Sequence, residues 1–198
     1  MRKMQHLFCQ LFLALLITLA MLSYSQKVIA QKTEVKFINQ KSLGAFVSTG
    51  FALYAIENGE KYQPILIGGV LHLPFYQTHG KFNVAIDLMP QFGIVPYNNK
   101  MEYEFGFNFI FNFGFQVTEN SILSISIGSG PHYITSSNDR QAPGFIFSDH
   151  LNIGYRHKFK SWQAGFSSGI RHVSNAGLEE PNLGIDSLGV GISVAKLF

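Results

Sequence analysis

The sequence is poor in cysteine and in charge, and each shortage excludes a class of protein. Its single cysteine, Cys9, lies in an apolar segment near the N-terminus, so disulfide bonds cannot hold the rest of the chain together. Only 14% of the residues are charged, whereas a soluble globular domain averages about 25%. Much of the surface of this protein is therefore expected to face something other than water.

Only one long apolar run is present, and its position predicts a secretory leader. A basic start precedes apolar residues 7–22, which is the form of a signal peptide. We expect residues 1–30 to be removed after Ala30, with segment 23–25 as a second candidate cleavage site, and Cys9 to leave with the leader. A retained membrane anchor is the alternative, although the run is short for a spanning helix.

The apparent excess of basic residues also belongs to this leader. The chain has 15 Lys and Arg and 12 Asp and Glu. Removal of residues 1–30 takes away Arg2, Lys3 and Lys27 and no acidic residue, which leaves 12 basic and 12 acidic residues. The sequence pI of about 8.9 is therefore no indication of nucleic-acid binding.

After the leader the sequence shows no long helical periodicity, and instead apolar and polar residues alternate. In residues 101–115 the odd positions are Met, Tyr or Phe, and the even positions are mostly Glu, Asn or Gly. Because side chains alternate across a strand, one face is aromatic and the other is polar or small. A strand of about fifteen residues is long for a soluble protein and suits a tilted membrane strand.

Similar alternation along the chain predicts eight strands. We place them at residues 43–56, 65–73, 84–92, 101–115, 123–128, 145–154, 162–174 and 186–198. Eight strands with a polar or small inner face predict an all-β fold, an antiparallel transmembrane β-barrel over residues 31–198 with a filled interior. Closure removes the free sheet edges, which lipid cannot satisfy. The alternative is a secreted β-sandwich or lipocalin-like barrel with its apolar faces turned inward.

Three polar residues interrupt the apolar face of the last two strands. With an even number of strands and both ends in the periplasm, the loop from Ala176 to Ile185 faces the cell exterior. The even positions of both strands are mainly apolar and should meet lipid, yet His172, Ser174 and Asp186 share this face. Ionisable groups on a lipid-facing surface are costly, so such residues call for an explanation.

These three residue types together suggest nucleophilic catalysis. Serine supplies a nucleophile, histidine accepts its proton, and aspartate orients and stabilises the imidazole. His172 and Ser174 are two positions apart on one face, about 7 Å along the strand. The alternative interpretation is a set of polar residues at the membrane interface with no chemical role.

The surrounding residues carry a resemblance to a known family. The stretch Arg-His-Val-Ser-Asn-Ala-Gly-Leu over residues 171–178, followed by Pro-Asn-Leu-Gly-Ile-Asp over 181–186, resembles the signature of the PagL-like lipid A 3-O-deacylases of the outer membrane. The sequence Gly-Ser-Gly-Pro-His-Tyr over 128–133 is more loosely similar.

The resemblance implies a serine esterase in the outer membrane of a Gram-negative-type cell. Its substrate would be lipid A or lipopolysaccharide, its product the released 3-O-acyl chain, and it would need no cofactor. Ser174 would be the nucleophile, His172 the general base and Asp186 the orienting acid. The acid of the family is typically Glu, so Asp186 is a departure, and Glu179 and Glu180 are substitute candidates.

Other polar residues receive more general interpretations. Asn175, Gly177 and Asn182 are candidate oxyanion donors, although residues of these types are also common in turns. Arg171 falls on the inner face, and we expect the inner Glu102 and Glu104 to pair with lumen residues such as Arg156.

Several alternatives stay open at this stage. The scattered histidines at positions 72, 132, 150 and 157 have no metal-ligand spacing, so no metal site is predicted. The rival functions are a non-enzymatic structural or adhesive barrel and an outer-membrane phospholipase. The oligomeric state is undetermined, with a homodimer among the options.

Overall fold

The described part of the chain begins just before the barrel. The computed structural model describes residues 36–198 except residues 55, 57–61, 79 and 98–99. The expected leader, the cleavage sites, the domain boundary at residue 31 and Cys9 lie outside these residues. Within the described part of the chain, no helix is long and apolar enough to span a membrane.

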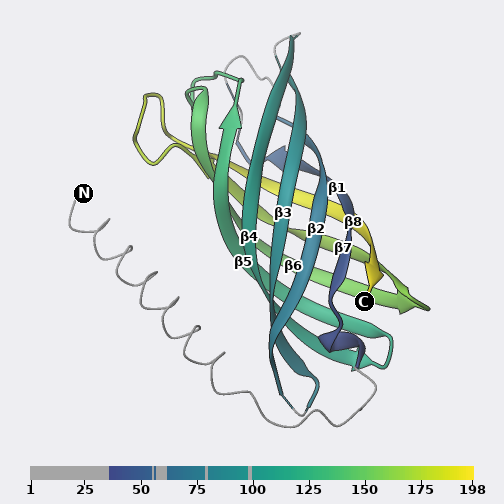
Figure 1. Cartoon of the computed structure of the whole chain (residues 1–198). Helices are drawn as coiled ribbons and strands as arrows, with labels where there is room; N and C mark the ends of the chain where they lie inside the picture. The colour runs from purple at the N-terminus through teal and green to yellow at the C-terminus, as the bar shows by residue number, and fades with distance from the viewer. Residues whose placement is uncertain (1–35, 55, 57–61, 79, 98–99) are drawn as a thin grey trace, which may run out of the picture. The chain divides into compact units, whose positions relative to one another are not determined.

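Eight antiparallel strands form a barrel (Figure 1). Each strand pairs with its neighbours in the sequence, and β1 also pairs with β8, which closes the barrel. A 3-10 turn, η1 (Phe37–Asn39), precedes them. The strands are β1 (Ser42–Ala52), β2 (Ile65–Gln77), β3 (Phe82–Tyr97), β4 (Lys100–Thr118), β5 (Ser121–Ile134), β6 (Gly144–Phe159), β7 (Trp162–Ser174) and β8 (Ile185–Leu197). The predicted fold class is confirmed, including the number of strands.

Several predicted boundaries differ from the structure: β2 to β6 extend beyond the predicted ranges, whereas the first strand is shorter than predicted. The first strand ends at Ala52, and Ile56 leaves the sheet to become buried in an apolar cluster at one end of the barrel. The last loop spans residues 175–184, because Ile185 already belongs to β8 and pairs with Val173.

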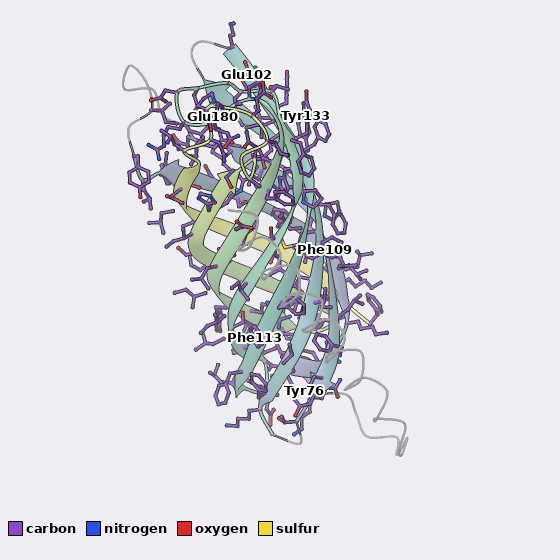
Figure 2. All side chains as sticks on the ribbon, turned by 90° about the vertical axis from the view of Figure 1, so that its left-hand side faces the viewer. Tyr76, Glu102, Phe109, Phe113, Tyr133 and Glu180 are labelled. Atoms are coloured by element: carbon purple, nitrogen blue, oxygen red, sulfur yellow. The ribbon has the colours of Figure 1, made fainter. Side chains whose placement is uncertain are left out.

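The two faces of the strands have opposite character, as the alternation predicts. On β4, Phe105 and Phe109 are more than half exposed on the outside, while Glu104 and Asn108 are buried inside. Figure 2 shows Phe109 and Phe113 on the outer surface of the barrel. An apolar exterior around a polar interior is the arrangement that lipid requires, so the soluble alternative with inward apolar faces is excluded.

Side chains fill most of the lumen. An apolar cluster closes one end and consists of Ile56, Tyr62, Val95, Ile134, Ile146, Val173 and Ile185. A second cluster near the other end consists of Phe37, Ile38, Ile122 and Leu197. Polar side chains lie between them around a cavity of about 180 Å³, so the barrel is filled rather than an open pore.

The connections between the strands give the barrel an orientation. Turns at residues 78–81, 119–120 and 160–161 are short, whereas three of the four connections at the opposite end, at 53–64, 135–143 and 175–184, are longer. Outer-membrane barrels have short turns on the periplasmic side and longer loops outside. The loop between β7 and β8 therefore lies at the extracellular end.

Candidate active site

The three polar residues lie where the strand phase predicts them. His172 and Ser174 on β7 and Asp186 on β8 are partly exposed on the outer face. Their neighbours Val173 and Ile185 point inward, are 1% and 2% exposed, and pair with each other across the two strands. The buried pair fixes the strand ends and thereby the direction of the polar side chains.

His172 and Asp186 are joined by a hydrogen bond. The register places them directly opposite each other, where side chains on one face of a sheet are close enough to interact. The Nδ1 of His172 lies 2.7 Å from the Oδ1 of Asp186, and the side chains are 37% and 31% exposed. The short aspartate side chain spans the distance because the two residues are cross-strand partners. The Nε2 atom of His172 forms no hydrogen bond to a described residue and can bond to another group.

The glycine before β8 leaves room for the imidazole. Gly184 has a φ of +73°, and a Cβ built on it would lie 2.5 Å from the Cε1 of His172. Any side chain here would collide with the ring and strain the backbone as well. Gly184 is therefore part of the wall that sets the position of His172.

Ser174 is the last residue of β7 and lies on the same face as His172. Its hydroxyl makes no hydrogen bond to any residue that the structure describes, so Ser174 lies two residues from His172 on one face without a hydrogen bond to the imidazole. Such contacts are often long in the absence of substrate.

The three candidate oxyanion donors form one network in the loop after Ser174. The Oδ1 of Asn175 accepts hydrogen bonds from the backbone N–H groups of Gly177 and Leu178 at 3.0 and 3.2 Å. Its Nδ2 donates to the carbonyl of Glu179 at 2.6 Å. The side chain of Asn175 is thus buried and used to shape the loop, and the Gly177 N–H is already paired.

Asn182 differs from the other two candidates. Its Oδ1 accepts a hydrogen bond of 2.9 Å from the backbone N–H of Asn175, the residue that follows Ser174. The carboxamide is therefore held next to the candidate nucleophile. Its Nδ2 group donates to none of the described residues and is available to a ligand.

The two loop glutamates do not contact the imidazole. The Oε2 of Glu180 accepts a hydrogen bond of 3.2 Å from the backbone N–H of Asn182, and Figure 2 shows Glu180 in the loop region at the same end as Glu102. Within the described residues, Asp186 is the acid that bonds to His172.

The loop between β5 and β6 supports the hairpin formed by β7 and β8, a role that sequence reasoning missed. The backbone carbonyl of Arg140 accepts hydrogen bonds from the N–H groups of Leu183 and Gly184, and its Nε donates to the carbonyl of Gly184 at 2.9 Å. The Ala142 N–H donates to the Pro181 carbonyl at 2.7 Å. No local sequence signal connects these loops, because they meet only when the barrel closes.

A second acid, Asp149 on β6, was also missed. The register places it opposite His172 on the side away from Asp186, and it is exposed on the outer face. The signal was present in the sequence, because Asp149 continues the outward phase of Phe145 and Phe147. His172 therefore has a carboxylate on each neighbouring strand.

The predicted pairing of an inner glutamate with lumen residues is found for Glu104, but the suggested partner, Arg156, is wrong. Glu104 is instead bound by Arg171, and by the Nδ1 of His132 at 2.7 Å; Glu102 accepts a hydrogen bond from Thr135. Arg156 lies far along β6, in register with Ile122, and its Nη1 is 3.1 Å from the Nε2 of His72. Strand register, which the sequence pattern does not give, separates the partners.

Tyr62 completes the inner network around Glu104. Its hydroxyl donates to the Oε2 of Glu104 at 3.3 Å. Burial raises the pKa of Tyr62 above its ordinary value, so the hydroxyl keeps its proton and acts as a donor. The predicted inward position of Arg171 is confirmed, since Arg171 is 6% exposed and bound to Glu104.

No group of three or more His, Cys, Asp or Glu side chains in the described ranges is arranged to bind a metal ion. The candidate site on the outer face consists of Ser174, His172, Asp186 and Asp149.

The barrel and its lipid-facing surface define the chain as an outer-membrane β-barrel protein. The family model for lipid A 3-O-deacylase (PagL) matches residues 20–195, so the chain belongs to this family. The family acts on lipid A in the outer membrane and consists of hydrolases that cleave ester bonds.

A solved structure agrees with the fold. The crystal structure of the outer membrane enzyme PagL aligns with a TM-score of 0.56 at 19% identity, over 75% of this chain and 97% of that chain. Neisserial surface protein A aligns with a TM-score of 0.49 at 12% identity, over 80% of this chain and 97% of that chain. No curated protein matches the sequence significantly. Neither the family match nor these structures support a homodimer, which stays a prediction.

Proposed function

We propose that this protein is a serine esterase that hydrolyses the 3-O-acyl ester of lipid A with Ser174, His172 and Asp186. The observation that carries the proposal is the 2.7 Å hydrogen bond between His172 and Asp186 on the lipid-facing side. Among the described residues, neither His172 nor Asp186 forms another side-chain hydrogen bond or ion pair. Ser174 on the same face adds the nucleophile.

In the proposed mechanism, the hydrogen bond between His172 and Asp186 supports a direction for each proton transfer. Asp186 accepts the Nδ1–H of His172, which leaves Nε2 unprotonated and able to accept the hydroxyl proton of Ser174. The Ser174 oxygen then attacks the ester carbonyl and forms a tetrahedral intermediate. Collapse of the intermediate breaks the ester bond, and His172 returns the proton to the sugar oxygen that leaves.

A second half-reaction regenerates the serine. Water attacks the acyl-serine while His172 takes one of its protons. As the bond between the acyl group and the Ser174 oxygen breaks, His172 gives that proton to the Ser174 oxygen, and the fatty acid departs with the oxygen from water. The acyl chain can lie along the apolar barrel surface throughout, so the lipid need not leave the membrane. No cofactor takes part in either half-reaction.

The developing oxyanion requires donors near Ser174. Asn182 supports this role best among the three candidates, since its free Nδ2 is held next to the peptide that follows Ser174. Asn175 and the Gly177 N–H contribute by shaping the loop, and they could reach the oxyanion only after exchanging the partners they now have.

The test is hydrolysis of purified lipid A by the protein refolded in detergent or expressed in an outer membrane, followed by mass spectrometry. We expect the wild type to release the 3-O-acyl chain and Ser174→Ala to lose about 10³-fold or more in rate. Ser168→Ala is the matched control, because Ser168 is on the same strand and face, with its hydroxyl bound to the carbonyl of Gly189 at 3.0 Å.

Three results would contradict the proposal. An unchanged acyl pattern with the wild type would favour a structural or adhesive barrel. Hydrolysis of phospholipid without hydrolysis of lipid A would favour a phospholipase. Full activity of Ser174→Ala would exclude Ser174 as the nucleophile.

A further inference from the structure

An apolar region lies near the candidate active site on the outer surface of the barrel. It is a groove of about 630 Å³ that crosses the strands from β6 to β2, a volume in the range of small-molecule sites. Its lining residues include the aromatic Phe105, Phe107 and Phe145 and the smaller Gly69, Pro90 and Pro131. Small and rigid residues between aromatic rings leave a channel across an otherwise bulky surface.

The strand register connects this groove to the catalytic serine. Pro131 pairs with Phe147, and Phe147 pairs with Ser174. Pro131 is thus two strands from Ser174, or about 10 Å at the spacing of strands in a sheet. Further from Ser174, Pro90 of β3 pairs with Phe107 of β4.

A ridge of two aromatic rings separates the groove from Ser174. The rings of Phe145 and Phe147 meet edge to face at 5.2 Å. Phe145 lines the groove on one side, while Phe147 lies opposite Ser174 on the other. A lipid whose ester is bound at Ser174 could therefore place a different chain across the ridge.

The groove lies at the depth of hydrocarbon chains. Tyr133, at its rim, stacks on Phe105 with ring centroids 5.3 Å apart, and tyrosines of outer-membrane barrels gather at the headgroup level. Figure 2 shows Tyr133 nearer than Phe109 to the end that carries Glu180. From β6 to β2 the groove crosses four strand spacings, about 19 Å, which suits a long acyl chain.

We propose that this groove binds a second acyl chain of the lipid molecule whose ester is cleaved at Ser174. This rests on the proposed function and deepens it, because it makes the enzyme selective for lipids with several chains. Binding a remote chain would hold the scissile ester in register with the serine, which is how remote contacts promote reaction. The groove is then a positioning site, separate from the catalytic residues.

Filling the groove tests the proposal. A Cβ on Gly69 would make only ordinary contacts, the nearest at 3.5 Å to Pro90, so Gly69→Leu should fold and fill the far end. Pro90→Ile fills the middle with a residue that favours strands and provides a second variant. Ala164→Leu is the control, since it adds the same bulk to the outer face of β7, outside the groove.

The readout is the ratio of kcat/KM for complete lipid A to kcat/KM for a glucosamine lipid whose only chain is the 3-O-acyl group. We expect the wild type to prefer the complete lipid, and Gly69→Leu and Pro90→Ile to reduce that preference about tenfold. Hydrolysis of the single-chain lipid and all activities of Ala164→Leu should stay at the wild-type level.

The outcomes separate the two proposals. A wild-type ratio in both folded groove variants, or an equal loss on both lipids, would overturn the groove as a chain-binding site. Retention of activity in Ser174→Ala would instead overturn the esterase mechanism. Folding of each variant is checked by its heat-dependent migration on a gel.

Discussion

Arg171 and His172 are consecutive residues of β7, yet they belong to two acid–base clusters with opposite properties. Arg171 points into the barrel and binds Glu104, which also binds His132, and both acid and histidine are completely buried. His172 points to the lipid and binds Asp186 alone, with both side chains about one-third exposed.

The comparison shows that burial and hydrogen-bond partners determine whether a histidine and its acid stabilise the fold or can act on a substrate. In the inner cluster every oxygen of Glu104 has a partner, from Arg171, His132, Tyr62 or Gln91. With both carboxylate oxygens of Glu104 bound, this buried cluster stabilises the fold. The outer cluster has an open Nε2 and a free serine hydroxyl, so it is suited to chemistry. The predictions below set the two clusters against each other.

Asp186→Asn should have the largest effect on activity. Asparagine cannot stabilise the imidazolium and favours the wrong tautomer, so we expect kcat to fall by about 10³–10⁴-fold. Asp186→Glu is the control and should keep activity within about tenfold, because it keeps the charge and restores the acid typical of the family. Lipid A hydrolysis is measured for both. Equal losses in the two variants would show that the length of the acid matters as much as its charge.

Glu104→Gln should reduce the stability of the fold rather than the rate of lipid A hydrolysis. It leaves the buried Arg171 without its carboxylate, and breaking a buried pair in this way costs about 3–5 kcal/mol of unfolding free energy. Glu102→Gln is the matched control two residues away on the same strand, and should change stability by about 0.5 kcal/mol or less. Urea unfolding measures both. A stable Glu104→Gln protein that has lost activity would contradict a purely structural role for the inner cluster.

Gly184→Ala should have an intermediate effect on activity. The added Cβ meets the ring of His172, and displacing a catalytic group by about 1 Å can reduce the rate about 10²-fold. Gly177→Ala separates this contact from backbone strain, because its φ is +81° but a Cβ there meets nothing within 4 Å. We expect both variants to lose about 1 kcal/mol of stability and Gly184→Ala alone to lose most of its activity. Similar rates for the two would contradict the contact.

Asp149→Asn should have the smallest effect. Its carboxylate lies opposite His172, yet it forms no ion pair with that imidazole among the described residues. An exposed charge of this kind contributes up to about 1 kcal/mol, so kcat/KM should fall about fivefold or less. A loss equal to that of Asp186→Asn would make Asp149 a second essential acid.

Much of the site could be predicted from the sequence because a β-strand has a period of two. The alternation within residues 162–174 and 186–198 is enough to place His172, Ser174 and Asp186 on the lipid side. Asp149 could have been found by the same rule. The Arg156 pairing failed because it needed the relative shift of distant strands, which the alternation of one strand does not contain.

The sequence by itself determined the membrane barrel, the number of strands and the face of each side chain, because these depend on local alternation of apolar and polar residues. Only the tertiary structure decided that Asp186 and Asp149 flank His172, that Gly184 leaves room for the imidazole, and that the loop at Arg140 supports the hairpin. These relations depend on register and barrel closure. Both are set by the packing of all eight strands together, so no single segment of the sequence encodes them.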